Sequence, residues 1–324
     1  MKTTGRSLWG VTYHYVRDLP RTRFPQIKGR LIADFEQQVD ELSQRFEMAT
    51  LESALAFLAG DYAPTRDLCL LVFDDGLKDH FTNVTPRLAE RGIQGQFFIT
   101  TACVEEHRVL SVHKNHFLMA AVDFDTYRRA FLERLAGLSP ATHTTVDAAK
   151  AQSTYPWDTP AVAAFKLLLN FEVPAPLRAR ILDGLFADFL GDEAVFARDL
   201  YLSWDEARQM QSAGMLLGGH THEHLALATL SAAQQQTDLT TCQRLLQQRL
   251  KPQALWPFTY PYGQRHSFDD TTVRVLQELG FDCAFTTVPE PNRAGHDRFL
   301  LGRVDTNDVN TRIPVAAGAV AASV

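Results

Sequence analysis

Seven short runs of β-branched, aromatic and other apolar residues occur along the chain, and each ends at a turn or a polar motif. Runs of this length and composition are typical of buried β-strands. The pattern therefore predicts seven strands, at residues 8–15, 68–73, 96–100, 215–219, 255–260, 283–288 and 299–304.

Apolar residues recur at helical spacing between several of these runs, as in residues 31–46. Capping boxes begin two more helices: Ser231 with Gln234 opens a helix over 231–250, and Ser203 with Glu206 opens one that leads to Gly214. Strands that alternate with helices pair in parallel. Seven of them in one chain predict an α/β fold built on a closed or nearly closed barrel.

The alternation is interrupted once, from residue 104 to residue 200, where no run resembles a strand. Helical spacing predicts helices there at 161–171 and 177–190, each after a proline. We therefore expect a barrel formed by residues 1–103 and 201–314, and a helical insertion or lid formed by residues 104–200. Residues 315–324 lack periodicity and are expected to be a flexible tail.

Composition excludes several other classes of protein. Of the 324 residues, 45% are hydrophobic and 22% are charged, as in ordinary globular proteins. The net charge of −6 argues against nucleic acid as a partner, and no stretch approaches the ~18 apolar residues of a membrane span. The four cysteines form no CxxC pair and the N-terminus lacks the apolar segment of a secretory signal, so we expect free thiols and a cytoplasmic protein.

The first chemical motif is Asp74-Asp75-Gly76, directly after the strand predicted at 68–73. Adjacent carboxylates at a strand end point in different directions, so one can bind a metal while the other faces a reacting water molecule. The apolar strand ahead of the pair distinguishes it from an ordinary solvated turn.

The second motif is GGHTHEH at residues 218–224, again after a predicted strand. His220 and His224 are four residues apart, which on a helical turn places both imidazoles on one face. With Asp75 they offer two nitrogens, one oxygen and an open position, the pattern of a catalytic zinc site, and cobalt or nickel accepts the same donors. In that geometry His222 points away from the other two.

Two further motifs follow later strands: FTYPYGQ at residues 258–264 and RVDTND at residues 303–308. A tight turn such as the first can present a backbone N–H to a developing oxyanion. Because all four motifs follow strands, they gather at the carboxyl ends of the strands, where barrel enzymes keep their active sites.

The order FDDG, HTxxH, YPYG and VDTND resembles the polysaccharide deacetylase family, also called the NodB-homology family or carbohydrate esterase family 4. The resemblance covers almost the whole chain outside the insertion. It implies a distorted (β/α)7 barrel that removes acetyl groups from sugars, with Asp75, His220 and His224 as ligands of one divalent metal. It further implies that Asp74 is the general base and that the backbone amide of Tyr262 helps to hold the oxyanion.

The sequence departs from the family pattern at two places. The arginine that usually stands two residues before the proline of the third motif is replaced by Thr259, and we expect Arg303, held by Asp305, to supply the guanidinium instead. The family's general acid is a histidine after a C-terminal strand, but no histidine follows His296 here.

The first predicted strand offers a replacement, because it ends near His14. A closed barrel sets its first strand beside its last, so moving that strand to the N-terminus keeps the histidine in place. Some relatives with a YPYG motif are similar in this respect. His14 is therefore our candidate acid, and His113 or His116 of the insertion is the alternative.

These residues predict metal-dependent removal of an acetyl group from an N-acetylated or O-acetylated sugar or polysaccharide precursor. One alternative is hydrolysis of another small amide by the same site. A second is a catalytically idle carbohydrate-binding protein, which is expected to have lost the base or the metal ligands.

Overall fold

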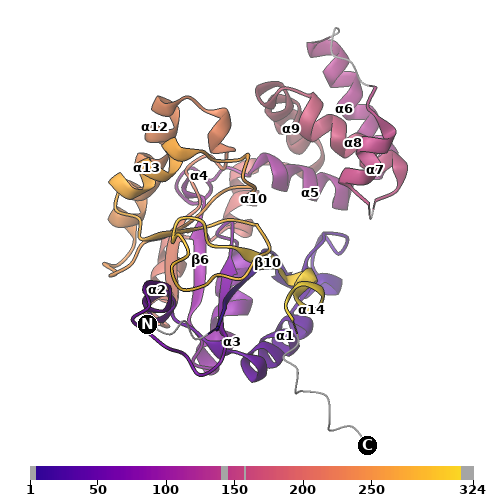
Figure 1. The fold of residues 1–324 in the computed structure, drawn as a ribbon. Coiled ribbons are helices and arrows are strands. Elements are labelled where there is room, and N and C mark those ends of the chain that lie inside the picture. The colour runs from indigo at the N-terminus through magenta and orange to yellow at the C-terminus, as the bar shows by residue number, and fades with distance from the viewer. Residues whose placement is uncertain (1–4, 140–144, 157, 315–324) are drawn as a thin grey trace, which may run out of the picture. The chain divides into compact units, whose positions relative to one another are not determined.

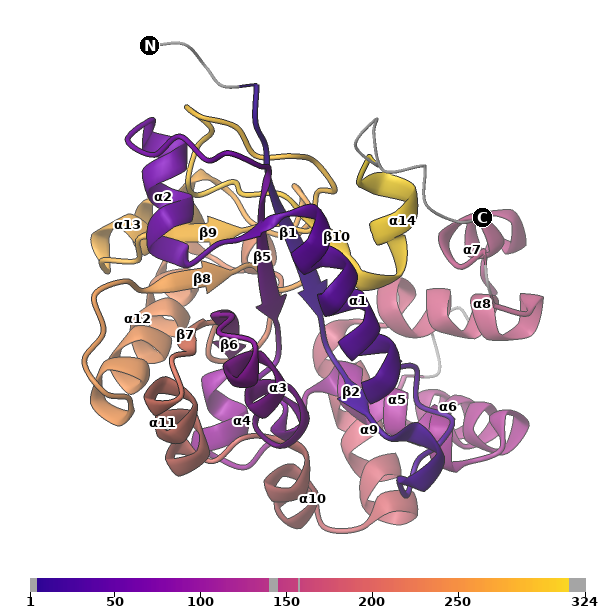
Figure 2. The ribbon, with the colours of Figure 1, turned by 90° about the horizontal axis from the view of Figure 1, so that it is seen from below.

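Parallel strands form the centre of the first of two units in this computed structural model, which describes residues 5–139, 145–156 and 158–314. Seven strands lie in the order β10-β1-β5-β6-β7-β8-β9, and each pairs in parallel with its neighbours (Figure 2). Their bounds are β1 Leu8–Tyr13, β5 Leu68–Phe73, β6 Gly95–Ile99, β7 Leu216–Gly219, β8 Pro257–Thr259, β9 Cys283–Phe285 and β10 Arg303–Asp305.

The two ends of this sheet meet, so the barrel is nearly closed. Phe285 of β9 forms an isolated parallel bridge with Leu301, which lies just ahead of β10. The predicted α/β barrel of seven strands is therefore confirmed. Three strands of two residues were not predicted, because two residues carry too little alternation to recognise: β2 Val16–Arg17 and β3 Arg30–Leu31, which pair with each other, and β4 Glu47–Met48, which pairs with β5.

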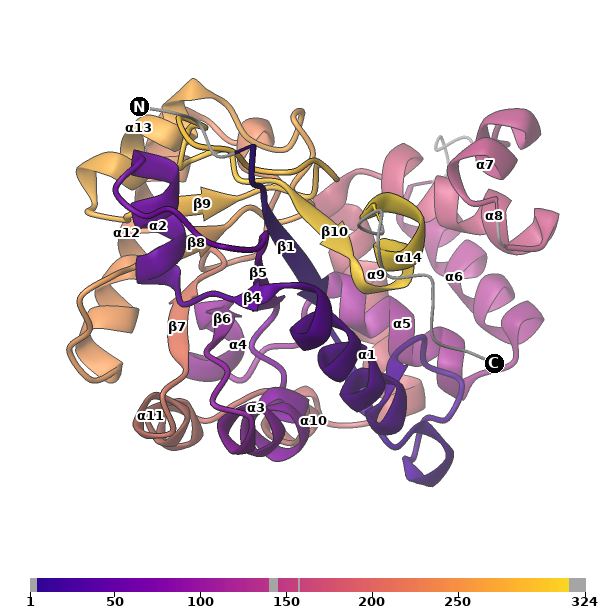
Figure 3. The same ribbon diagram turned by 60° about the horizontal axis from the view of Figure 1, so that its bottom comes forward.

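Helices of the first unit surround the strands (Figures 2 and 3). The helices predicted at 31–46 and 231–250 are confirmed to within one residue at each end, and both capping boxes are present. The α-helices of this unit are α1 Ile32–Arg45, α2 Leu51–Ala59, α3 Thr85–Glu90, α4 Thr101–Glu105, α11 Trp204–Ser212, α12 Ala232–Arg249, α13 Asp270–Glu278 and α14 Val309–Arg312. Its shorter helices are the π-helix η2 His80–Val84 and the 3-10 helices η4 Leu227–Thr229 and η5 Thr306–Asp308.

The two faces of each strand pack into different hydrophobic clusters. Odd-numbered residues of β5 join a cluster that includes apolar side chains of α1, α12 and α13. Even-numbered residues of β5 join another, with side chains of β1, β6, β9 and α2. The first cluster thus lies under the covering helices, and the second fills the inside of the barrel. Since side chains alternate along a strand, this numbering also fixes which residue at each strand end turns inward.

The second unit comprises Leu19–Lys28 and Val109–Phe196 and is helical (Figure 1). Its helices are η1 Leu19–Arg21, α5 Ser111–Ala121, α6 Phe124–Leu138, α7 Ala148–Thr154, α8 Pro160–Leu167, the π-helix η3 Leu168–Glu172 and α9 Ala175–Leu190, while α10 Glu193–Leu200 spans the boundary with the first unit. The predicted helices at 161–171 and 177–190 correspond to α8 with η3 and to α9.

The bounds of the second unit differ from the insertion predicted at 104–200, because residues 19–28 belong to it as well. Phe24 is the reason: its ring packs against Phe117, with centroids 5.0 Å apart, and against Phe196, with centroids 5.7 Å apart. A single aromatic residue in a loop gives no such signal in the sequence. The tail predicted at 315–324 lies outside the described residues.

All four cysteines are free and buried, as expected: Cys69, Cys103, Cys242 and Cys283. Among the residues that the structure describes, no helix combines the length and the apolar character that a membrane crossing requires.

Candidate active site

Asp74 and Arg303 form a buried ion pair at the carboxyl ends of the strands. Nη1 of Arg303 lies 2.9 Å from Oδ1 and 2.8 Å from Oδ2 of Asp74, and Nε of Arg303 donates to the carbonyl oxygen of Thr286 at 2.8 Å. Both residues continue the inward alternation of their strands. Gly10 of β1 is paired with Arg303, and a Cβ there would lie 3.0 Å from Cγ of Arg303, so the missing side chain makes room for the arginine.

This pairing decides the charge of Asp74. Burial by itself raises the pKa of a carboxyl group, but the Arg303 guanidinium, together with His220 and His14, outweighs burial and holds the pKa of Asp74 below its usual range. The carboxyl is therefore ionised and can accept a proton. The guanidinium expected in place of an arginine at Thr259 thus reaches Asp74 from β10.

Asp305 does not hold Arg303, contrary to our expectation. Its Oδ1 accepts hydrogen bonds from the backbone N of Asn307 at 2.8 Å and from Nδ2 of Asn307 at 2.9 Å, at the start of η5. Short acidic side chains readily bond backbone N–H groups two residues ahead, and this local cap takes the carboxylate. The carbonyl of Thr286 orients the guanidinium instead.

Asp75, His220 and His224 form the group that could hold a metal ion. Nε2 of His220 and Nε2 of His224 each lie 3.4 Å from Oδ1 of Asp75, and the three candidate ligand atoms lie within 4.8 Å of one another. The side chains are 3%, 9% and 5% exposed for His220, His224 and Asp75, respectively. The structure thus brings the three predicted ligands together.

The two histidines do not share a helical turn, which corrects the geometry expected from their spacing. After β7 ends at Gly219, residues 220–224 form an irregular loop. Thr221 and His224 have φ of 64° and 57°, so two left-handed residues turn the chain and bring the rings to 4.9 Å between centroids. A turn of this kind has no period that a sequence pattern could reveal.

Two side chains hold the loop in this conformation, one from within the loop and one from α12. Oγ1 of Thr221 accepts from the backbone N of His224 at 2.8 Å. Asp238 of α12 accepts from the backbone N of His222 and of Glu223, each at 2.9 Å. Satisfying these N–H groups stabilises a backbone that is otherwise unfavourable for residues with a Cβ.

The donor set fits a divalent metal. Two ligands each about 2.1 Å from a tetrahedral zinc lie roughly 3.4 Å apart, which is the separation between Oδ1 of Asp75 and each imidazole nitrogen. Nδ1 of His220 lies 2.8 Å from the carbonyl oxygen of Thr259, which can only accept, and 2.6 Å from Oγ1 of the same residue, which can accept as well. Nδ1 therefore carries the hydrogen and leaves the Nε2 lone pair for the metal, the arrangement typical of metal-ligating histidines.

His222 points away from this group, as expected. Its Nδ1 lies 2.9 Å from Oγ1 of Thr101, and its Nε2 lies 3.1 Å from Glu106. His222, Glu106 and Glu223 form a second group of potential ligands. Arg108 lies 2.8 Å from Glu223 and 3.6 Å from Glu106, so a guanidinium already neutralises these carboxylates.

His14 directly follows β1 and lies at the same end of the barrel. Its Nε2 is 4.0 Å from Oδ2 of Asp75, and its side chain is 46% exposed. β1 pairs with β10 on one side and with β5 on the other, so the first strand does lie beside the last. Of the alternative histidines, His113 is buried and His116 is exposed, both on α5 of the second unit.

Tyr262 of the YPYG turn lies beside the candidate metal ligand His224. Its ring lies edge-on to that of His224, with centroids 5.3 Å apart, and its carbonyl accepts from Oγ1 of Thr287 at 2.9 Å. With a φ of 64°, Tyr262 is another residue in the left-handed region, as are Asp75 and His224. Unfavourable backbone conformations of this kind gather at functional sites.

Sequence reasoning missed three residues that hold the site: Thr259 behind His220, Thr286 behind Arg303, and Asp238 behind the histidine loop. Two of them act through backbone carbonyls, which every residue has. The third is an acidic residue within a long helix, where solvent exposure is the ordinary expectation.

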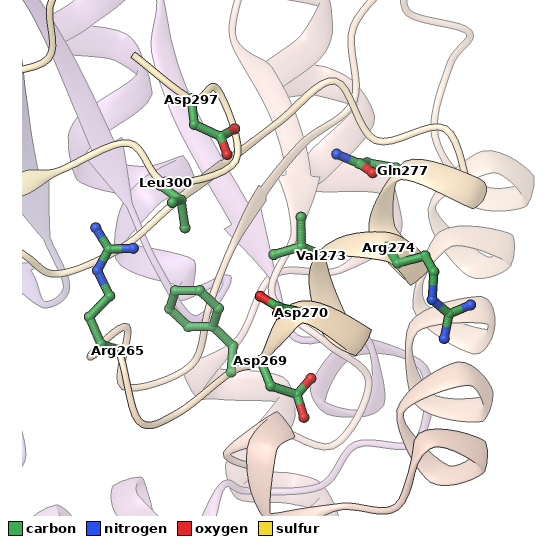
Figure 4. A pocket seen from close by; sticks show the side chains of 9 residues that line it. Arg265, Asp269, Asp270, Val273, Arg274, Gln277, Asp297 and Leu300 are labelled. Atoms are coloured by element: carbon green, nitrogen blue, oxygen red, sulfur yellow. The ribbon is translucent and has the colours of Figure 1, made fainter.

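A cavity of about 340 Å³ lies elsewhere in the first unit, beside α13 (Figure 4). Charged side chains of both signs line it, including Arg265, Asp269 and Arg274, together with apolar side chains such as Leu300. Asp269 is engaged in capping α13 through the backbone N of Thr272. None of the predicted site residues lines this cavity.

Comparison with known proteins agrees with the motifs. Residues 176–284 match the family model for polysaccharide deacetylase, a stretch that includes the histidine loop and the YPYG turn. No curated protein matches the sequence of this chain. The predicted resemblance to the polysaccharide deacetylase family is confirmed over this stretch of the chain.

Solved structures of low sequence identity share the fold. The deacetylase PplD of Streptococcus pyogenes is 14% identical with a TM-score of 0.56, covering 95% of this chain and 99% of that one. IcaB from Ammonifex degensii is 20% identical with a TM-score of 0.56, covering 94% of each chain. The BpsB deacetylase domain from Bordetella bronchiseptica is 17% identical with a TM-score of 0.55, covering 94% of this chain and 97% of that one. At these identities the likeness concerns the fold.

His220→Ala and His224→Ala should each abolish stoichiometric metal binding, because either change removes one of three ligands. The metal content of zinc-loaded, desalted protein, determined by elemental analysis, checks this. His222→Ala is the matched control, since it removes an imidazole from the same motif that faces Thr101 and Glu106, and it should keep the wild-type content. Full retention of metal in both ligand variants would contradict the site.

Arg303→Met should destabilise the chelator-treated protein by about 3–5 kcal/mol, because it leaves the Asp74 carboxylate buried without its partner. Urea unfolding followed by circular dichroism measures the change. The double variant Asp74→Asn with Arg303→Met removes both charges and should lose less stability than Arg303→Met alone. An unchanged unfolding midpoint in Arg303→Met would show that the pair does not stabilise the barrel.

Proposed function

We propose that this protein is a metal-dependent hydrolase that removes an acetyl group from an N-acetylated or O-acetylated sugar or polysaccharide precursor. One observation supports the proposal: an ionised, buried Asp74 lies next to three residues that could hold a metal ion, and the exposed His14 lies beside them. A base, a set of metal ligands and a solvent-accessible imidazole are groups that metal-assisted hydrolysis of an amide can use.

Asp75, His220 and His224 would hold the metal, most suitably zinc, although cobalt and nickel accept the same nitrogen and oxygen donors. A divalent metal supplies Lewis acidity that polarises the acetyl carbonyl and lowers the pKa of water. The two neighbouring carboxylates favour a cation there: burial lowers the pKa of the His220 imidazole, but Asp74 and Asp75 outweigh burial and raise it.

The chain's own residues then move two protons. Asp74 accepts a proton from the attacking water as the water oxygen bonds to the acetyl carbon, and Arg303 keeps that carboxylate ionised and aimed. The backbone amide of Tyr262 is our candidate donor to the oxyanion. When the carbon–nitrogen bond breaks, the departing amine takes a proton from His14, which leaves acetate and a free amino sugar.

Acetate release from purified, zinc-loaded protein tests the proposal. We expect acetate from N-acetylated oligosaccharides or monosaccharides, loss of the activity on treatment with a chelator, and recovery when zinc is returned. Simple amides without a sugar, such as acetanilide and formamide, are the matched comparison. Hydrolysis of these alone would favour the small-amide alternative.

Binding of a sugar without acetate release under any of the three metals would instead identify an idle carbohydrate-binding protein. An O-acetylated sugar measured beside the N-acetylated one distinguishes the two kinds of acetyl group.

A further inference from the structure

Residues 79–83, shortly after the Asp74-Asp75 motif, form hydrogen bonds with the backbone at His14 and Val16. Nε2 of His80 lies 3.0 Å from the carbonyl oxygen of His14, and Nδ2 of Asn83 donates to the carbonyl of Val16 at 2.8 Å. Oδ2 of Asp79 accepts from the backbone N of Val16 at 3.2 Å. Asp79, His80 and Asn83, here called the strand clamp, therefore bond the backbone at His14 itself and at Val16, two residues later.

A histidine at position 80 stabilises the fold less than an apolar aromatic residue would, if packing is its only role. His80 is fully buried, with ring centroids 5.5 Å from Phe73 and 5.6 Å from Phe97, and burial lowers its pKa to about 4. The carbonyl of His14 can only accept, so the neutral ring donates through Nε2–H. Its Nδ1 then stays buried with no hydrogen-bond partner among the described residues. A phenylalanine would fill the same space without that unsatisfied atom.

His80 lies in a segment of unusual helix geometry. His80 begins η2, a five-residue π-helix that precedes α3. Such segments are rare and are frequent at functional sites. Asp79 also accepts from Nε of Arg17 at 2.7 Å, so the clamp contacts the chain from His14 to Arg17.

The backbone contacts of His14 matter because few contacts hold its imidazole ring in place. Within the described residues, Nε2 of the ring contacts Oδ2 of Asp75 at 4.0 Å, and the side chain is 46% exposed. With no hydrogen bond to fix the side chain, the position of the ring follows from the position of its backbone. A displacement of about 1 Å in such a group can lower a rate about a hundredfold.

We propose that the strand clamp positions His14 for proton donation to the leaving group, and that His80 is a positioning residue rather than a core histidine. This inference rests on the proposed function, in which His14 is the general acid. It predicts a defect that depends on the leaving group, because only a poor leaving group needs the proton.

The experiment compares zinc-loaded variants on two substrates: an N-acetylated sugar, whose amine is a poor leaving group, and 4-nitrophenyl acetate, whose phenolate leaves without protonation. His80→Phe should lower kcat on the amide by about 10- to 100-fold and change kcat on the ester by less than about threefold. His80→Gln, whose side-chain amide can donate to the same carbonyl, should recover most of the amide activity. Asn83→Ala should show the same selectivity with a smaller loss.

The double variant His14→Ala with His80→Phe supplies the decisive comparison. If the clamp acts through His14, the double variant is no slower on the amide than His14→Ala alone. Multiplicative losses would overturn the inference while leaving the proposed acid intact. If His14→Ala itself has no leaving-group dependence, the proposed function fails at that residue, and the two failures are thus distinguishable.

Thr85→Val is the matched structural control. Oγ1 of Thr85 donates to the backbone carbonyl of His80 at 2.8 Å, so the change removes a buried hydrogen bond from the same π-helix but keeps the side chains through which the clamp bonds the backbone at His14 and Val16. It should leave both activities near wild type. Unfolding curves for His80→Phe should match the wild-type curve, because the aromatic packing is retained. A selective amide defect in Thr85→Val, or equal losses on both substrates in His80→Phe, would contradict positioning.

Discussion

The buried pair between Asp74 and Arg303 is the interaction on which the site depends. A carboxylate removed from water takes up a proton unless a positive group stands beside it, and a protonated Asp74 could not accept a proton from water. The two residues are 229 positions apart in sequence: Asp74 directly follows β5 and Arg303 begins β10, and these two strands flank β1. Closure of the barrel through β1 therefore places beside this carboxylate the guanidinium that does most to keep it ionised.

The alternation of side chains along the strands determines which site residues point into the barrel, and the turns after the strands determine the positions of the others. Inward alternation carries Asp74 and Arg303 into the barrel, but Asp75, His224 and Tyr262 reach their places through left-handed backbone. Each such residue costs on the order of 1–3 kcal/mol, so the surrounding structure must hold it. For the histidine loop that support comes from Asp238, whose two oxygens accept from successive backbone N–H groups.

Much of this could be predicted from sequence because the signals are periodic or adjacent. Seven apolar runs indicated the strands, and the motifs after them indicated which strand ends carry chemistry. The helical geometry assumed for His220 and His224 was wrong, since two left-handed residues produce the same proximity without any period. Asp305 was misjudged because a local cap competes with a distant guanidinium, and spacing alone cannot rank the two.

Other features have no local signature at all. The carbonyls of Thr259 and Thr286 orient His220 and Arg303, and any residue could have provided them. The assignment of residues 19–28 to the helical unit rests on the packing of Phe24, which only the folded chain reveals. The contact of His80 with the backbone of His14 likewise joins segments 66 positions apart.

The central claim is that Asp74 is the base while the neighbouring residues bind the metal. The most direct test is the rate of acetate release by Asp74→Asn, measured beside its metal content. We predict one zinc per chain, as in the wild type, and a rate lowered by at least about 100-fold, because the amide cannot take the proton from water. An Asp74→Asn protein that keeps its zinc and the wild-type rate would contradict the account.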